Sequence, residues 1–327
     1  MASTLCFLSF LSVFVTFCVL APATLTVPSH HDWEVNIVLI EDGIDQHPGT
    51  SVHSKEAYYQ EVFLSVSRRL ELLRAGTFYF MRKRFLTLSH DESQALFVRN
   101  GRLANINQVF LQWKSTLATK YRRHTAGKDL VILLTRRMIT APNGEGGSGF
   151  ALKGSLCTPD SFVLVKDDGS FLAVNNFVKV FLNSMGIDVD GVGAAGCCQN
   201  DEGHLMGTDL HLPLTFSDCT MRQLPDAIRN LTCLRKVASS KSAKTLPIPP
   251  LISRLAYCSA LSLGHCDKLG MGTLTGLTYP EKFCFVFCCR GFGPLNKMVA
   301  PDGLQCGKDV TGFVDRRCIN GECVQVK

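Results

Sequence analysis

The sequence predicts a three-layer α/β (α+β) domain with a mixed sheet and helices, followed by a small disulfide-rich module. Two observations predict this organisation. In the first two thirds of the chain, short apolar runs typical of strands alternate with stretches in which apolar residues recur every three or four positions, as in amphipathic helices. The 15 cysteines are unevenly placed, because none lies between residues 24 and 156 and eight lie in the last seventy residues.

The strand and helix patterns follow one another along the first domain. Residues 35–40 and 130–134 are apolar runs that we expect to be strands, the second of them fully buried, and residues 78–80, 150–152 and 162–165 are expected to be shorter strands. Three apolar stripes predict helices. They comprise Tyr59, Val62, Phe63, Val66, Leu70 and Leu73, capped by Ser54 and closed by Gly76; Ile106, Val109, Phe110, Trp113, Leu117 and Tyr121; and Phe177, Val178, Phe181, Leu182 and Met185, closed by Gly186.

Composition excludes several classes of protein. Hydrophobic residues make up 46% of the 327 residues and charged residues 19%, so a folded domain with a sizeable core is expected rather than a disordered chain. The formal net charge of +6 is mild, and it predicts no nucleic-acid partner. After the first two dozen residues no run approaches the roughly 18 consecutive apolar residues of a membrane helix, so no membrane span is expected.

The N-terminus predicts the compartment. Residues 5–20 form an apolar run followed by the small residues Ala21 and Ala23, so residues 1–23 are expected to be a cleaved signal peptide and the protein to be secreted. Its removal leaves 13 cysteines, which an oxidising environment would hold in disulfides. These are Cys157, Cys197, Cys198, Cys219, Cys233, Cys258, Cys266, Cys284, Cys288, Cys289, Cys306, Cys318 and Cys323. The sequon at Asn230 predicts a glycan there.

A segment rich in small, polar and proline residues divides the chain. It spans residues 237–252 and is expected to link a core-built domain, residues 32–236, to a module, residues 253–327, that disulfides stabilise. The five cysteines of the first domain leave one over. It is expected to be free, or bonded to the module, or bonded to another chain.

Several segments resemble, in their order, one known family. Residues 129–135 and 149–157 are followed by Gly203-His-Leu-Met206-Gly, by Phe216-Ser-Asp-Cys219-Thr and by Cys233-Leu234. Together they resemble the reprolysin (adamalysin) zinc metalloproteases, which have the metzincin fold. There the segment matching 149–157 is an edge strand that holds the substrate, and Met206 matches the Met-turn. The resemblance implies disulfides from Cys157 to Cys219 and from Cys197 or Cys198 to Cys233.

The tail extends the resemblance. Residues 301–307 and 317–324 are similar to the disintegrin-like, cysteine-rich module of proteases with thrombospondin motifs. Tick salivary metalloproteases combine these two parts, which implies a secreted, extracellular protein of saliva or a similar secretion. Arg-Gly-Asp does not occur in the chain, so no integrin role based on that tripeptide is expected.

The sequence departs from the family at the residues that bind zinc and carry out the reaction. The family carries His-Glu-x-x-His-x-x-Gly-x-x-His-Asp, in which three histidines bind zinc and the glutamate is the base. Here Lys179, Asn183 and Val189 stand at the ligand positions and Val180 at the base, whereas Gly186, Asp190 and Met206 are retained. An ammonium repels a dication, and valine neither coordinates metal nor accepts a proton. We therefore expect no zinc, no other cofactor, no catalytic residue and no hydrolysis.

The preferred interpretation is a pseudoprotease that binds extracellular or host proteins, such as matrix or haemostatic proteins. The alternative is an active zinc-dependent metalloendopeptidase that uses a variant site, and a disulfide-rich structural or storage protein is a weaker third interpretation. The first strand follows the signal peptide directly, at about residue 34. No inhibitory pro-segment is therefore expected, as for a protein with no activity to suppress.

Two interpretations of Lys179 and Asn183 stay open, since the two residues lie one turn apart on one helix face. They either line a vestigial cleft, with Lys179 in the metal position and paired with a carboxylate such as Asp188 or Asp190, or they lie on a solvated face. Nearby, Glu202, His204 and His211 together with Asp201 and Asp209 could form another metal site, but polar loop residues are the favoured interpretation. The pair His30-His31 is expected to be an N-terminal tail.

Four basic clusters carry a further alternative. They are residues 82–84, 120–123, 136–137 and 235–236. If they share one surface they would bind heparan sulfate, whereas separate solvated charges are the favoured interpretation. Elution from heparin below about 0.3 M salt would reject heparan sulfate binding.

Overall fold

The computed structural model describes most of the first predicted domain and part of the C-terminal module. The described residues are 31–42, 55–97, 103–140, 146–169, 171, 173–208, 212–237, 246–253, 256–258, 264–265, 284–289, 296–306 and 316–326. The predicted signal peptide, His30, Ser54, residues 238–245 of the predicted linker, Asp209, His211 and Cys266 lie outside them.

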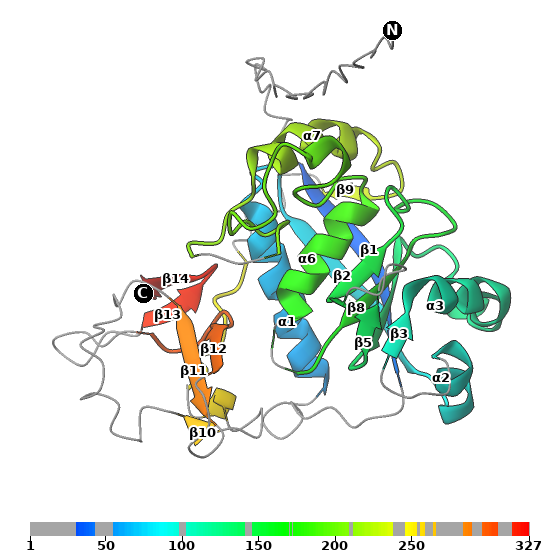
Figure 1. Ribbon diagram of the computed structural model, residues 1–327, viewed down its shortest axis with the longest axis horizontal. Helices are drawn as coiled ribbons and strands as arrows, with labels where there is room; N and C mark the ends of the chain where they lie inside the picture. The colour runs from blue at the N-terminus through cyan, green and yellow to red at the C-terminus, as the bar shows by residue number, and fades with distance from the viewer. Residues whose placement is uncertain are drawn as a thin grey trace, which may run out of the picture.

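A mixed six-stranded sheet forms the centre of the first domain (Figure 1). Its strands are β1 (Asp32–Glu41), β2 (Phe78–Thr87), β4 (Leu130–Thr135), β7 (Gly149–Ala151), β8 (Phe162–Lys166) and β9 (Arg235–Val237). The order is β2-β1-β4-β8-β7, with β9 paired to β1. The strands β2, β1, β4 and β8 are parallel, whereas β7 and β9 are antiparallel to their neighbours. The predicted strands are thus confirmed, and β4 is buried along its whole length, as a parallel strand covered on both faces should be.

Helices cover both faces of this sheet and give three layers. They are α1 (Lys55–Glu71), α2 (His90–Leu96), α3 (Ile106–Gln112), a π-helical turn (Trp113–Leu117), α4 (Ala118–Lys120), α5 (Arg122–Thr125), α6 (Ala173–Ser184), a 3₁₀ turn (Gly193–Ala195) and α7 (Asp218–Arg229). One core cluster joins the sheet to α1 and α6, and a second joins the other face to α2 and α3. The predicted fold class is confirmed.

The predicted apolar stripes explain these two layers. In α6 the phenylalanines Phe177 and Phe181 are buried and their rings pack against Phe80 of β2. The second stripe is one continuous apolar surface, although its helix is interrupted by the π-helical turn, within which Trp113 stacks on Phe162 of β8 with ring centroids 4.7 Å apart. After α1, Gly76 has φ +107, and a Cβ there would lie 1.8 Å from the His31 carbonyl oxygen, so only glycine fits.

Smaller sheets lie outside the central six-stranded sheet. They contain β3 (Leu103–Asn105), β5 (Met138–Thr140) and β6 (Gly146–Gly147) in the first domain, and β10 (Gly264–His265), β11 (Phe285–Cys289), β12 (Asn296–Val299), β13 (Arg316–Ile319) and β14 (Glu322–Gln325) in the C-terminal module. The module has its own small core, crossed by disulfides between Cys258 and Cys288, Cys284 and Cys318, and Cys306 and Cys323. Disulfide stabilisation of this part, predicted from its cysteine content, is therefore confirmed.

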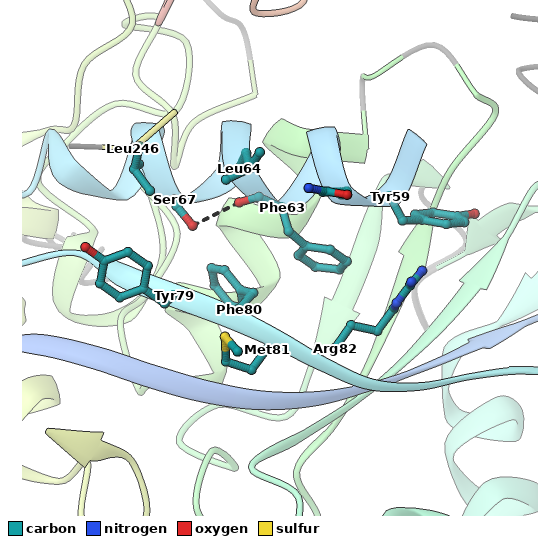
Figure 2. A pocket seen from close by; sticks show the side chains of 10 residues that line it. Tyr59, Phe63, Leu64, Ser67, Tyr79, Phe80, Met81, Arg82 and Leu246 are labelled. Carbon is teal, nitrogen blue, oxygen red and sulfur yellow. Dashed lines mark hydrogen bonds between the residues drawn. The ribbon is translucent and has the colours of Figure 1, made fainter. Parts of the chain in front are cut away.

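Residues 246–253 run from the first domain to the module. Leu246 lines a hollow of about 340 Å³ between α1 and β2, beside Ser67 and Tyr79 (Figure 2). Farther along, Ile252 forms a backbone bridge with Leu304 of the module. This segment therefore contacts both parts of the protein.

Candidate functional site

Helix α6 lines one side of a cleft. The cleft has a volume of about 880 Å³, and Lys179, Val180 and Asn183 line it from this helix, while Val189 lines it from the loop that follows. The four residues expected at the motif positions therefore lie around one cavity. The interpretation of Lys179 and Asn183 as cleft residues is supported, and a freely solvated helix face is excluded for them.

The edge strand β7 borders the cleft. Gly149, Phe150 and Ala151 all line it, and β7 is the last strand of the sheet on this side. A Cβ at Gly149 would lie 2.6 Å from Cγ1 of Val180, so the valine at the position of the family's base packs directly against the edge strand. The expected edge strand at residues 150–152 is confirmed for the first two of these residues.

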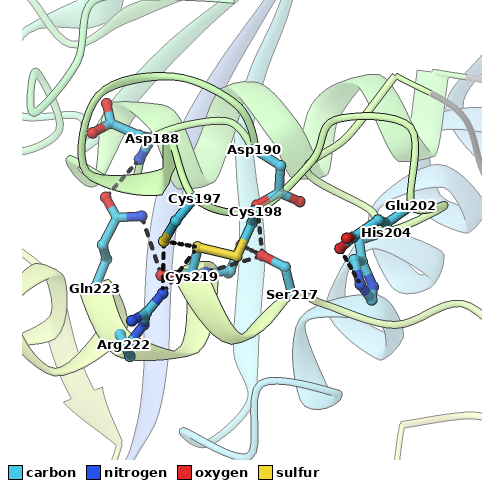
Figure 3. Close-up of a disulfide and its surroundings, with 11 residues drawn as sticks. Asp188, Asp190, Cys197, Cys198, Glu202, His204, Ser217, Cys219, Arg222 and Gln223 are labelled. Atoms are coloured by element: carbon cyan, nitrogen blue, oxygen red, sulfur yellow. Dashed lines mark hydrogen bonds and ion pairs between the residues drawn. A yellow bond between two sulfur atoms is a disulfide. The ribbon is translucent and has the colours of Figure 1, made fainter. Parts of the chain in front are cut away.

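The loop after α6 forms a further wall. Asp190 donates its backbone N–H to the carbonyl oxygen of Met206 at 3.2 Å, and Met206 is 1% exposed at the floor of the cleft. The Asp190 carboxylate, 2% exposed, accepts a hydrogen bond of 2.5 Å from the Ser217 hydroxyl (Figure 3). Ser217 also accepts the N–H of Thr220 and so caps α7. The retained aspartate and methionine thus hold the wall in place.

Replacing Ser217→Ala should therefore destabilise the protein. The variant removes an N-cap, worth about 0.5–2 kcal/mol, and a hydrogen bond to a buried charge, worth about 1.5–3 kcal/mol. We expect the free energy of unfolding in urea to fall by about 2–4 kcal/mol. Ser115→Ala, at an exposed serine on the π-helical turn, is the matched control. Equal stability of the two variants would contradict this role of Ser217.

Lys179 does not bind the carboxylates expected for it. Its ammonium donates to the carbonyl oxygen of Gly207, across the cleft from α6. Asp188 instead binds the ammonium of Lys153 at 2.7 Å and the N–H of Ala194 at 2.9 Å, and Asp190 binds Ser217. The expected pairing with Asp188 or Asp190 was therefore wrong: Lys153 and Ala194 bind Asp188, Ser217 binds Oδ1 of Asp190, and Oδ2 of Asp190 is buried with no hydrogen-bond partner among the described residues.

The electrostatics at Asp188 follow from these contacts. Burial alone would raise the pKa of the Asp188 carboxyl. The hydrogen bonds from Lys153 and Ala194 outweigh burial and hold this pKa below its usual value. Asp188 is consequently ionised at neutral pH and fixes the turn around Ala194 beside the cleft.

The residues at the position of the family's zinc do not fit that ion. The ammonium of Lys179 has N–H groups and no lone pair that could coordinate a metal ion. The side chains of Val180 and Val189 contain no atom that could coordinate one. The Asn183 amide donates to the carbonyl oxygen of Ile187 at 3.2 Å. Among the described residues, acidic, histidine and cysteine side chains come close enough to share an ion at two places, and both consist of cysteines that form or adjoin disulfides. Neither place is the cleft.

Two disulfides in the first domain differ from the expected pairing. Cys157 bonds Cys233, and Cys198 bonds Cys219 (Figure 3), so the expected pairs Cys157–Cys219 and Cys197 or Cys198 with Cys233 were wrong. The partners are decided by which loop lies at each end of α7, whose 12 residues rise about 18 Å. Cys219 lies in its first turn and Cys233 lies beyond its end, so each meets a different loop. Disulfides need Cα atoms within about 7 Å, and the observed separations are 5.2 and 6.1 Å.

The sulfur of Cys197 lies beside the second bridge. It is 3.5 Å from Sγ of Cys219, and the guanidinium of Arg222 contacts both sulfurs, at 3.2 and 3.1 Å (Figure 3). The sequence left open whether Cys197 or Cys198 bonds Cys233, and neither does, because Cys233 bonds Cys157 and Cys198 bonds Cys219.

Contacts in the loop near Met206 support the interpretation of Glu202 and His204 as polar loop residues rather than as metal ligands. His204 bonds the hydroxyl of Thr215 at 2.9 Å, and Glu202 lies 3.8 Å from its ring (Figure 3). Both contacts are ordinary polar contacts of a loop. Asp209 and His211 lie outside the described residues. At the chain's beginning, His31 packs edge-on against Trp33.

The basic clusters are only partly available for an anionic partner. Arg137 is buried, binds Asp42 at 2.9 Å and stacks over Phe97, so its inclusion in a surface cluster was wrong. Lys83 and Arg235 share Glu34, at 3.9 and 3.8 Å. These pairs favour separate solvated charges, and heparan sulfate binding stays a prediction.

The structure adds cleft residues that the sequence did not single out. Met138 and Val192 are exposed apolar side chains at its rim, 55% and 56% exposed, and Asn175 and Asn200 line it with amides. No local motif marks them, because they come from four different segments. The Ser217 cap, in contrast, could have been found, since serine before a helix with an acidic first turn is a standard N-cap pattern.

The last two observations concern the predicted glycosylation site and the crossing of a membrane. Asn230 is exposed at the end of α7, where a glycan would have room, and the glycan itself stays a prediction. Within the described part of the chain, no helix combines the length and apolar character needed to cross a bilayer.

Part of the chain matches a known protein family. Residues 97–237 match the family described as Reprolysin (M12B) family zinc metalloprotease. No curated protein matches the chain in sequence. Among solved structures, archaemetzincin from Methanopyrus kandleri is 14% identical, with 60% of this chain and 96% of that chain covered and a TM-score of 0.38. Metalloproteinase-II from Bacteroides fragilis is 16% identical, with 65% and 55% covered and a TM-score of 0.36.

A third structure, described as a chaperone–substrate complex, is 11% identical. It has 62% of this chain and 35% of its own chain covered, with a TM-score of 0.36. The chain therefore spans little more than a third of this relative and about half of the Bacteroides protein.

Proposed function

We propose that this chain, whose residues 97–237 are a reprolysin-type (M12B) segment, is a secreted pseudoprotease that binds extracellular or host proteins without cleaving them. The observation that carries the proposal is the lining of the cleft. The positions of the three zinc ligands and of the base are present around one cavity, but they hold Lys179, Asn183, Val189 and Val180.

Hydrolysis by the family's reaction needs a polarised water and a group that accepts its proton. Val180 has no atom that accepts a proton. Lys179 brings a positive charge to the place where a dication would have to bind, and its ammonium already donates to Gly207. These replacements remove both the metal that would polarise the water and the base that would accept its proton. The reaction therefore keeps neither of the two groups that it needs.

The same cleft retains what binding needs. The edge strand β7 borders it and can accept an extended peptide as an added strand. Apolar side chains at the rim, Met138 and Val192, and the amides of Asn175 and Asn200 would contact the side chains of that peptide. An apolar contact area surrounded by polar groups is typical of protein–protein interfaces.

The cysteines support the proposed extracellular location. Five described disulfides are typical of a protein that matures in an oxidising compartment, in agreement with the signal peptide expected at residues 1–23. In such a compartment the partners would be extracellular proteins, and we propose matrix or haemostatic proteins among them.

Metal analysis together with a protease assay tests the proposal. Purified full-length protein should contain far less than one zinc per chain and should leave casein and fibrinogen intact, with and without chelator. An active zinc endopeptidase assayed in parallel is the control. Stoichiometric zinc with chelator-sensitive cleavage would overturn the proposal and establish the alternative, an active metalloendopeptidase with a variant site.

A binding experiment tests the role of the cleft separately. Immobilised protein should retain proteins from plasma or matrix extract, and Val192→Asp at the cleft rim should reduce the retained amount at least about tenfold, because a buried unpaired charge is costly. Leu111→Asp is the matched control, since Leu111 is 66% exposed on α3 and does not line the cleft. Equal retention by both variants would exclude the cleft as the binding site.

A further inference from the structure

Two consecutive arginines of α1 lie buried against the C-terminal module. Arg68 and Arg69 are 4% and 2% exposed, and their guanidinium groups lie 3.5 and 3.6 Å from Oδ2 of Asp302, whose side chain is fully buried. Asp302 follows β12 and belongs to the module. A buried carboxylate between two buried guanidinium groups is stable only while all three stay together, because each charge left alone would cost several kcal/mol of desolvation.

The tip of the last hairpin sits at the same place. Asn320 and Gly321 join β13 to β14 and have φ +50 and +81, as a two-residue turn with two left-handed residues requires. The Asn320 backbone N–H donates to Oδ1 of Asp302 at 3.0 Å, and its side-chain amide donates to the carbonyl oxygen of Arg68 at 3.1 Å. The turn is thus bound both to Asp302 and to α1.

Gly321 reaches a loop that leads to the cleft. A Cβ at Gly321 would lie 2.5 Å from Cδ2 of Leu212 and 3.2 Å from Cγ of Leu214, so the turn packs directly on these leucines. The next residue, Thr215, accepts the backbone N–H of Leu205 at 2.8 Å. Leu205 precedes Met206, which lines the cleft. Contacts therefore run without a gap from the module to the cleft wall.

Residues 246–253 strengthen the contact. Arg68 donates to the carbonyl oxygen of Pro247, and Arg317 of β13 donates to that of Pro249. Ile252 exchanges backbone hydrogen bonds of 2.8 Å with the module, donating to Gly303 and accepting from Gln305. The segment predicted as a linker therefore lies, over its described part, along the same interface.

We propose that Asp302 and the Asn320–Gly321 turn dock the module onto α1 and thereby hold the cleft wall that contains Met206. Asp302 is a positioning residue in this arrangement, and so is Gly321. The inference goes beyond the proposed function, because it holds whatever the cleft binds. It assigns the disulfide-rich module a structural task within the first domain rather than an independent one.

Hydrogen exchange on the full-length protein tests this docking. In Asp302→Asn, amides of the non-proline residues in 246–253 and 204–215 should exchange at least about tenfold faster than in the parent, because the two arginines lose their buried counter-charge. Amides of β4 and β8 should keep their rates. Asp226→Asn is the matched control, since Asp226 pairs with Arg229 on α7 and both side chains are about three-quarters exposed.

Gly321→Ala gives a second, uncharged test. It adds one methyl group at φ +81 against Leu212 and should speed exchange in residues 204–215 without changing any buried charge. Unchanged exchange in residues 204–215 in both variants would overturn the proposal. Acceleration spread equally over β4 and β8 would also overturn it, because the residues would then act on global stability and not on docking.

Discussion

Histidines at the three ligand positions are expected to restore a zinc site. The change is Lys179→His, Asn183→His and Val189→His in one chain, and the expected result is one zinc bound per protein. The three positions already surround one cavity, and Asp190 and Met206 keep the wall in place beneath it. Residues 179 and 183 lie one helical turn apart, the spacing at which two histidines share a metal ion.

Metal analysis and thermal or urea unfolding measure this result. Zinc at one hundred times its dissociation constant should raise the free energy of unfolding by about 2.7 kcal/mol, because it binds the folded state only. Lys179→Ala, Asn183→Ala and Val189→Ala together form the control, since they open the same space without donor atoms. The control and the parent should not be stabilised by zinc.

Adding Val180→Glu to the histidine variant separates binding from hydrolysis. The glutamate would supply the proton acceptor that valine lacks, so chelator-sensitive cleavage of casein is expected only in the variant with all four changes. A folded histidine variant that binds no zinc would show that the three ligand positions do not converge as a zinc site requires. The proposed loss of activity would then need another cause.

The layers of the fold could be predicted because they depend on local pattern. Phe177 and Phe181 recur at helical spacing and are buried, and the apolar run of β4 is long enough for one strand and lies inside the sheet. The cleft could be located because the motif positions are read from one helix and the loop after it. Lys179 and Asn183 could not be assigned to cleft or solvent, since the helix pattern gives their face but not what lies opposite.

Long-range pairing is what the sequence could not predict. Arg137 stands in a basic dipeptide that resembles a surface cluster, yet it is buried because Asp42, far away in the sequence, follows the neighbouring strand. Asp302 is likewise invisible as a partner of Arg68, because the contact depends on how the module lies on α1. The predicted cysteine pairs were wrong for the same reason, since the position of α7 in the fold decides which loops its two ends contact.

Removing the Cys157–Cys233 bridge is the second change with a large expected effect. In Cys157→Ala with Cys233→Ala, the unfolded chain loses a cross-link between residues separated by 76 positions. Chain entropy predicts a loss of about 4.5 kcal/mol in the free energy of unfolding, against about 3.4 kcal/mol for Cys198→Ala with Cys219→Ala, whose separation is 21. Urea unfolding of the two variants measures the difference.

The order of these two losses depends on the pairing. Had Cys157 bonded Cys219, each double variant would remove one member of two bridges and both would destabilise the protein to a similar, larger extent. Non-reducing peptide mapping decides the point directly, since one disulfide-linked peptide should join residue 157 to residue 233. A peptide joining Cys157 to Cys219 would contradict the structure around α7. The observed pairing ties the end of α7 to the loop after β7, so this bridge connects the strand that borders the cleft with the end of the first domain.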